Sequence, residues 1–482
     1  MDLRPFLIFA GAGAFLWAIV RWRTAVQLVM VLLVLEGAIR KWLFPGAQDL
    51  VYLAKDVLLL GAYAGCLRDR ALNRIKPPPL PAFHSALALG AVVGFLQIFN
   101  PKLPNLLVGL LGFKAYLLYV PLIFVVPAAL PTDRELVSFL RRYIMLSIPV
   151  GLLGVAQFLS PSGSFLNVYA RPDEATGYVS TFGSSNFVRV TATFSYITGY
   201  GSYLVAMTIL ILAYLAATRW RLRPSLAAYV ALGMAAVGML MTGSRGPVLI
   251  LALLFPLYWW LAVMRGAEGG ATFARLLVGV GLLGLLLASV GSEAVGAFVG
   301  RAAGSEDIGE RLTLPFISPW ETLPAAGPLG YGIGATHQTA AAVTGGIAPY
   351  SWLHGQVFEA ESGRVMFELG PVGFLLVYFV RVYLIFFALR QVLALTTTFH
   401  RAIATACLMF FLAELPGSIV FDITSDLFYW FFGGLLLTVM RLDRLANLRA
   451  ARAGAAAMPP AAPALPRIPP LPAAASRPGR AS

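Results

Sequence analysis

Residues Val357–Leu389 read VFEAESGRVMFELGPVGFLLVYFVRVYLIFFAL. The first part of this stretch holds Glu359, Glu361, Arg364 and Glu368, and the second part is almost entirely apolar. A helix needs roughly 20 apolar residues to cross the hydrocarbon core of a bilayer, and the second part is of about that length. The stretch therefore predicts a transmembrane helix with an unusual concentration of charge at its entrance. That entrance is the first place to look for chemistry.

The composition of the whole chain is that of a polytopic membrane protein. Of its 482 residues 59% are hydrophobic and only 12% are charged, whereas soluble domains average about 25% charged residues. Apolar segments recur along the chain, so we expect an all-α fold with about 11–13 transmembrane helices and a large, partly helical external loop. The predicted apolar segments are at about 6–20, 24–39, 50–66, 82–99, 105–127, 137–159, 190–217, 225–242, 247–264, 275–290, 364–389, 402–420 and 426–440.

The connecting turns predict how the chain is oriented. If the turn Arg21–Arg23 is cytoplasmic, the alternation of spans places the other arginine-rich turns on the same side. These turns are 68–76, 134–142, 219–223, 265–275, 390–401 and the tail after Arg441. The positive-inside rule therefore predicts an external N-terminus and a cytoplasmic C-terminus.

The charge and the cysteines exclude several classes of function. In a membrane protein a net charge of +14 marks cytoplasmic loops and attraction to anionic lipid, so we expect no nucleic-acid partner. The two cysteines, Cys66 and Cys407, adjoin apolar segments and fit neither a disulfide framework nor the spacing of a metal site. We expect no metal and no other cofactor.

Five regions follow from the segment pattern. We assign N-terminal transmembrane helices to 1–160, a first external loop and central transmembrane helices to 161–290, and a large external loop to 291–363. C-terminal transmembrane helices occupy 364–442, and a basic tail rich in Ala and Pro occupies 443–482, for which we expect disorder. A loop as long as 291–363 is usually functional or disordered, and its Trp and Pro content favours a packed lid.

Isolated cations remain on the predicted external side. They are Arg40, Lys41, Lys102, Arg171, Arg189, Arg245, Arg301, Arg311 and Arg364. Arginine suits phosphate because its planar guanidinium donates two parallel hydrogen bonds and stays charged. The alternative is that such a residue extends to lipid phosphate or pairs with a nearby acid. Glu36 and Arg40, four residues apart, fit a pair within one helix.

Six segments together resemble the O-antigen ligase and O-antigen polymerase family of bacterial membrane glycosyltransferases. They are EGAIRKWLFP (36–45), VGLLGVAQFLSP (150–161), VRVTATFSY (188–196), TGSRGPVLIL (242–251), GPLGYGIGA (327–335) and ESGRVMFELGPVG (361–373). Their order, with a large predicted external loop before the last segment, carries the resemblance. The tail and the last two predicted spans add little to it.

The resemblance implies a metal-independent, inverting sugar transfer on the periplasmic face of the bacterial inner membrane. The donor is a glycan on a polyprenyl diphosphate, and the acceptor is another glycan or a lipid. Carried onto this chain, the resemblance implies that Arg189 and Arg245 bind the diphosphate, with help from Arg364; Arg40 and Arg311 are further candidates. Polymerase and ligase share donor and face, so the choice between them stays open.

The chain departs from the family pattern at the base. Many family members carry a His-Asn pair about nine residues before the Glu that Glu368 matches, and here Glu359 and Ala360 occupy those positions. We therefore expect Glu359 or Glu361 to activate the acceptor hydroxyl, with His354 as the alternative. A carboxylate can serve if burial raises its pKa toward the working pH. His337 is interpreted as a packing residue of the loop.

Two other classes of function stay open. A transporter for lipid-linked sugars would carry charges near mid-membrane, for which Lys55, Asp56 and Glu414 are candidates. A non-catalytic membrane subunit of a polysaccharide export complex would use the long loop as a docking surface. Glu361, Arg364 and Glu368 also fit a purely structural ion network, because their spacing places them on one helical face.

Overall fold

The computed structural model describes residues 4–70, 80–170, 179–182, 187–218, 222–261, 296, 308–337, 340–344 and 359–457. The chain divides into two units, Met1–Asp443 and Arg444–Ser482. The described part of the second unit is the helical stretch 444–457. The predicted segment at 275–290, His354 and the tail beyond 457 lie outside the described residues.

The expected all-α class is confirmed, because the described chain is about 79% helical and contains no strand. Its longer helices are α1 (Arg4–Val20), α2 (Trp22–Ala38), α3 (Gln48–Arg68), α5 (Pro81–Gln97), α6 (Leu106–Leu117), α7 (Leu122–Ala129), α8 (Asp133–Phe158), α9 (Ile197–Ala217), α10 (Leu222–Thr242), α11 (Arg245–Trp259), α14 (Ile308–Ala326), α16 (Glu361–Ala394), α17 (Thr398–Ala413) and α18 (Ile423–Ala457). Short helices lie at Ile39–Leu43, Pro45–Ala47 and Ala340–Val343.

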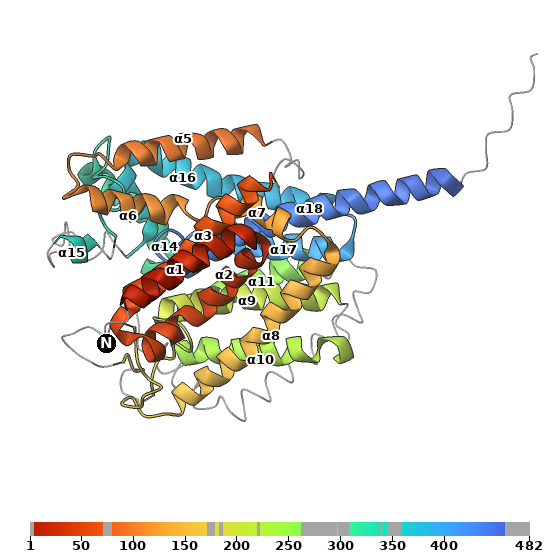
Figure 1. Ribbon diagram of the computed structural model, residues 1–482, viewed down its shortest axis with the longest axis horizontal. Helices are drawn as coiled ribbons and strands as arrows, with labels where there is room; N and C mark the ends of the chain where they lie inside the picture. Colours follow the sequence, from red (N-terminus) through yellow and green to blue (C-terminus); the bar gives the residue numbers. More distant parts are fainter. Residues whose placement is uncertain are drawn as a thin grey trace, which may run out of the picture. The chain divides into compact units, whose positions relative to one another are not determined.

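Several of these helices suit a membrane. Within the described residues, seven are long and apolar enough to cross it, or eight if the bent pair α6 and α7 forms one span. Four further apolar helices have 10–17 residues. In Figure 1 the helices of the first unit lie side by side, with α5 beside α16 and α9 beside α10. The structure therefore confirms a multi-pass helical protein.

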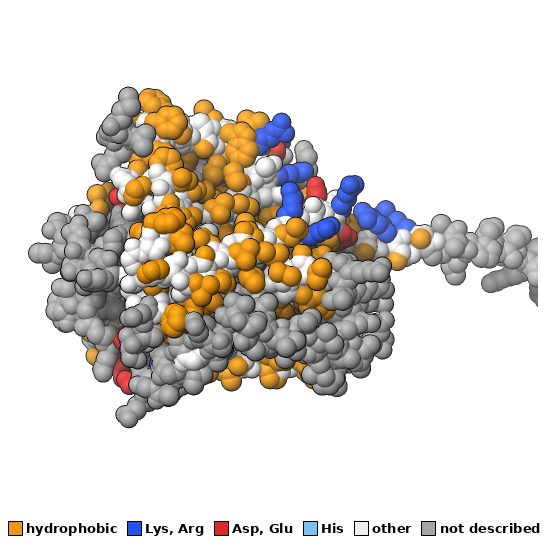
Figure 2. Space-filling model, turned by 90° about the horizontal axis from the view of Figure 1, so that it is seen from below, with side chains coloured by type: hydrophobic (Ala, Val, Ile, Leu, Met, Phe, Trp, Pro, Cys, Tyr) orange, Lys and Arg blue, Asp and Glu red, His pale blue; other side chains and the backbone are white. Residues whose placement is uncertain are grey.

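The helices of the first unit share two ends. At one, which we call the arginine end, the indole of Trp22 donates to Asp69 (2.8 Å) and Arg441 donates to the carbonyl of Pro131 (2.7 Å). The other, which we call the loop end, gathers the segments 39–47, 98–105, 159–170, 187–196, 241–246 and 327–337. There the amide of Gln97 donates to the carbonyl of Leu329 (2.6 Å). Figure 2 shows hydrophobic side chains over one flank, with Lys and Arg gathered toward one end.

Some boundaries differ from the prediction for physical reasons. The predicted segment 190–217 becomes helical only at Ile197, because residues 187–191 are extended and residues 192–196 form a turn, in which the Phe194 amide donates to the carbonyl of Thr191 (2.9 Å). Lys41 donates to the carbonyl of Ala192 (2.8 Å), and the side chain of Gln157 accepts from the Ala192 amide (2.7 Å). The predicted segment 105–127 is broken instead into α6 and α7, bent by 47°.

Helix α16 is two arms joined by a sharp turn. Gly370 has φ 66° and ψ −176°, a conformation open to glycine, and Pro371 follows it. Along a straight helix Glu361 and Arg381 would lie about 30 Å apart, yet their side chains form an ion pair. The arm 361–369 therefore folds back along the arm 371–394. The long apolar arm of α16 thus begins at Pro371, after the turn, and the charged residues 361–368 lie on the shorter arm.

Gly37 allows α2 to lie directly against the turn at 192–196. A Cβ at this position would come within 2.4 Å of the Ser195 amide nitrogen and the Thr193 carbonyl oxygen. We expect Gly37→Ala to destabilise the protein by about 1–3 kcal/mol, because neighbouring backbone must move to accept the methyl group.

Gly13 supplies the matched control for that variant, since it lies inside α1 and its Cβ would meet nothing within 4 Å. Gly13→Ala should stabilise the protein by about 0.5–1 kcal/mol through helix propensity alone. Thermal unfolding of both variants in detergent checks the pair. A Gly37→Ala variant as stable as Gly13→Ala would contradict the close approach.

Candidate functional site

Charged side chains are treated differently at the two ends of the helices. At the arginine end the cations are exposed, among them Arg21, Arg23, Arg68, Arg70, Arg134, Arg141, Arg142 and Arg390. Toward the loop end Arg40, Lys41 and Lys55 are buried, and Lys114, Arg189, Arg245 and Arg364 are partly buried. Withdrawing charge from solvent is costly. The loop end is therefore where the fold concentrates buried cations.

A cationic cluster of Arg40, Lys55 and Lys114 surrounds the ring of Tyr52. The ring centroid lies 4.2 Å from Nζ of Lys55, 4.7 Å from Nζ of Lys114 and 5.3 Å from Cζ of Arg40. Each cation faces the negative surface of the ring, a favourable arrangement. Helices α2, α3 and α6 meet at this cluster.

Two carboxylates balance the cluster only in part. Glu36 pairs with Lys55 (2.5 Å) and more loosely with Arg40 (3.5 Å). Asp56 pairs with Lys114 (2.5 Å) and accepts the hydroxyl hydrogen bond of Tyr119 (2.6 Å). The predicted intrahelical pair between Glu36 and Arg40 therefore exists, but Lys55 is the closer partner. The three cations of the cluster thus outnumber the two carboxylates that pair with them.

Arg364 and His337 extend this site from the other side. The guanidinium of Arg364 stacks 3.6 Å above the ring centroid of Phe421 and donates to the hydroxyl of Thr336 (3.1 Å). Burial, with the nearby charges of Lys114 and Arg364, lowers the pKa of His337 to about 4. The ring is therefore neutral at physiological pH and can accept a proton. His337 is therefore a candidate base beside these cations, in addition to the packing role that we predicted.

Glu361 and Glu368 are both engaged within the fold. Glu361 is buried, pairs with Arg381, and accepts from the backbone amide of Phe421 (3.2 Å). Glu368 accepts from the hydroxyl of Tyr116 (3.0 Å) and from the amide of Thr336 (2.7 Å). The network interpretation is therefore supported for these two carboxylates. Their partners are Tyr116 of α6, Arg381 of α16, and the backbone amides of Thr336 and Phe421 in loops.

Of the other predicted bases, Glu359 is exposed just before α16, and His354 lies outside the described residues. The predicted anion ligand Arg311 belongs to α14, and its side chain also lies outside the described part. Two of the predicted residues therefore lie at the site. Arg40 lies beside Tyr52, and Arg364 lies near His337.

Arg189, one of the two arginines predicted to bind the diphosphate, lies against the turn before Arg245, the other. Nε of Arg189 donates to the carbonyl of Thr242 (2.9 Å), and Nη2 donates to the hydroxyl of Ser244 (3.1 Å). The Val190 amide donates to the carbonyl of Met241 (3.0 Å). The side chain of Arg189 and the amide of Val190 thus link residues 187–191 to the turn that precedes α11.

Two further acids adjoin the site, Glu414, which is buried, and Asp422, which is partly buried. The Glu414 carboxylate accepts from Ser425 (3.1 Å), and Asp422 accepts from Ser202 (2.7 Å). Within the described residues no group of His, Cys, Asp and Glu has the arrangement of a metal site.

One signal for the residues that we missed was present in the sequence. Lys114 interrupts the apolar segment 105–127, and a charge inside such a segment is a functional hypothesis by default. Tyr52 and His337 carried no such signal, because their role depends on neighbours distant in the sequence.

Comparison of the chain with protein-family models finds no match. Comparison with curated proteins finds none either.

Proposed function

We propose that this protein transfers a glycan from a polyprenyl diphosphate at the loop end of its helices, as a polymerase or ligase of surface polysaccharide. The observation that carries the proposal is the set of cations withdrawn around Tyr52 and His337, in contrast to the exposed cations of the arginine end. A leaving diphosphate needs fixed positive charge that is shielded from water. Arg40, Lys55, Lys114 and Arg364 would supply that charge.

The segments that carry the family resemblance also contact one another. Arg40 of the first segment donates to the hydroxyl of Ser195 in the third (2.9 Å), and Arg189 reaches the fourth at Thr242. In the last two segments, the Tyr331 amide donates to the carbonyl of Phe367 (2.9 Å). Contact between segments so distant in the sequence supports one shared site.

In this mechanism the acceptor oxygen attacks the anomeric carbon of the donor sugar, and the bond from that carbon to the diphosphate breaks. The bonding electrons leave with the polyprenyl diphosphate, whose charge Lys114 and Arg364 stabilise. The acceptor proton passes to the neutral ring of His337, which adjoins both cations. Glu359 is the alternative base, since its carboxylate is exposed before α16.

The pH profile distinguishes the two bases. The pH dependence of kcat/KM reports the base in the protein without bound donor. If that base has a pKa of about 4, kcat/KM stays level as pH falls from 8 to about 5. Lys114→Met removes one of the charges that lower this pKa, so the acidic limb should move upward toward the ordinary histidine value of about 6.5. Rates of transfer at fixed donor concentration between these pH values check this. An acidic limb unmoved by Lys114→Met, and a level profile in His337→Gln, would favour Glu359.

We further propose that the loop end faces the periplasm, because the exposed arginines of the opposite end mark a cytoplasmic side. Lys102 is exposed at the loop end and Arg141 lies toward the arginine end, while Cys66 and Cys407 are buried. In intact cells a membrane-impermeant maleimide should label Lys102→Cys and leave Arg141→Cys unlabelled. The reverse pattern would overturn this orientation.

The deciding experiment incubates purified protein with a lipid-linked oligosaccharide. A lengthened glycan identifies a polymerase, and transfer to a different lipid identifies a ligase. If no covalent product forms while the protein moves the donor across a liposome membrane, the chain is a transporter instead. If neither occurs, the proposal of a catalytic or transport function fails.

A further inference from the structure

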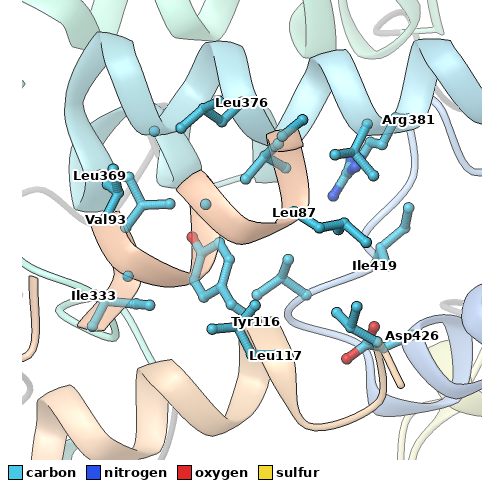
Figure 3. Close-up of a pocket in the computed structure, with 18 of the residues that line it drawn as sticks. Leu87, Val93, Tyr116, Leu117, Ile333, Leu369, Leu376, Arg381, Ile419 and Asp426 are labelled. Atoms are coloured by element: carbon cyan, nitrogen blue, oxygen red, sulfur yellow. The ribbon is translucent and has the colours of Figure 1, made fainter. Parts of the chain in front are cut away.

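A cavity of about 80 Å³ lies between α5, α16 and α18. Its wall is mostly apolar and includes Leu87, Val93, Leu117, Ile333, Leu376 and Ile419. Figure 3 shows Arg381 and Asp426 on the same side of this cavity, away from Leu369 and Ile333. The cavity is thus amphipathic, with an apolar body and one polar end.

Two buried polar atoms at this end have no hydrogen-bond partner in the described part of the chain. They are Nη1 of Arg381 and the hydroxyl oxygen of Tyr429, in side chains that are 3% and 1% exposed. The other Arg381 amino group is bonded to Glu361, and the guanidinium lies 4.8 Å from the ring of Tyr378. An unmade hydrogen bond of this kind is costly, so these atoms indicate a ligand that completes them.

The charges at the polar end limit what that ligand can be. Arg381 is already neutralised by Glu361, and Asp426 adds a second carboxylate that is 2% exposed. A phosphate or carboxylate would face these two acids, and an ammonium would face Arg381. A hydroxyl fits all three groups, because its oxygen accepts from Arg381 or Tyr429 while its hydrogen is donated to Asp426.

The polar end of the cavity lies deep along α16. Arg381 comes ten residues after Pro371, which is about 15 Å along the helix from the turn at the loop end. The hydroxyl of the ligand would therefore lie near the middle of a span.

We propose that the cavity binds the hydroxyl-bearing end of a neutral, long-chain lipid alcohol. The chain packs along the apolar wall of α5 and α16, and the hydroxyl bridges Arg381, Tyr429 and Asp426. The site is independent of the proposed glycan transfer, since neither its ligand nor its test involves a sugar donor.

Photolabelling of the purified full-length protein tests the site. The probe is dodecanol carrying a diazirine, compared with the dodecanoic acid, dodecylamine and dodecane analogues. We expect the alcohol to label peptides of α5 and α16 in a saturable manner, and the three analogues to label them at least about tenfold less at equal concentration, the ratio that about 1.4 kcal/mol produces.

Two variants and one control keep the test sharp. Gly90 lines the cavity and its Cβ would meet nothing within 4 Å, so Gly90→Leu should fill the space and abolish labelling. Tyr429→Phe removes only the hydroxyl and should weaken labelling by the alcohol several-fold while leaving the weak labelling by dodecane unchanged. Gly13→Leu on α1, where a Cβ would likewise meet nothing, should label like the unaltered protein.

The outcomes separate cleanly. Equal labelling by alcohol and dodecane would show a non-specific apolar cavity and overturn the proposal. Labelling that survives Gly90→Leu in a variant with unchanged thermal stability would do the same. Both labelling results can be read whether or not the protein transfers a glycan.

Discussion

Replacing Glu361 by alanine should destabilise the protein by about 3–5 kcal/mol, because the variant leaves Arg381 as an uncompensated buried charge. Both side chains are almost fully buried, and Glu361 also accepts from the backbone amide of Phe421. The single change therefore breaks the link between the folded-back arm 361–369, the long arm 371–394 and the segment before α18. Thermal unfolding of the detergent-solubilised protein measures the loss.

The double variant Glu361→Leu, Arg381→Met is the control. Replacing a buried ion pair by apolar side chains of similar volume is often neutral or stabilising, so the double variant should recover most of the stability lost by Glu361→Ala. If the double variant is as unstable as the single one, the pair is not what holds the arm. If it folds normally but transfers no glycan, Glu361 has a chemical role after all.

Helix positions could be predicted from the sequence because they depend on local composition. The apolar segments at 24–39, 50–66 and 137–159 match α2, α3 and α8 closely, since runs of apolar residues at this length have few alternatives in a membrane. Residues 187–196 are the informative failure. Their apolar character favours a helix. However, Lys41, some 150 positions earlier, donates to the hydroxyl of Thr191 and to the carbonyl of Ala192 and so holds this backbone in a non-helical conformation.

The candidate site was only half accessible to prediction for the same reason. The arginines could be named, because an isolated cation beside an apolar run is conspicuous in a sequence. It could not be predicted which of these arginines pair with acids, because the partners lie far apart in the chain. The turn at Gly370 brings Glu361 into contact with Arg381. The packing of α6 against α3 brings Lys114 into contact with Asp56.

Lys114→Met should lower glycan transfer by about 10²–10³, the usual loss when one preorganised donor to a developing charge is removed. Lys114 is 21% exposed in its side chain and lies against Tyr52, so it can reach a bound anion while remaining shielded from water. Lys114→Arg keeps the charge and should retain most of the activity. Lys102→Met removes an exposed lysine of the same end and should change the rate little.

Asp56→Asn decides between an anion-binding role and a merely structural role of Lys114. If Lys114 only neutralises Asp56, removing the carboxylate charge should be as harmful as Lys114→Met, because it breaks the same pair. If Lys114 holds the diphosphate, Asp56→Asn frees the cation, and inorganic diphosphate should inhibit this variant at lower concentration than it inhibits the unaltered protein. Tyr119 still donates to the amide oxygen of the new side chain, so the packing of α3 against that tyrosine is kept. Stronger inhibition of Asp56→Asn combined with weaker inhibition of Lys114→Met is the pattern that only direct anion binding by Lys114 produces.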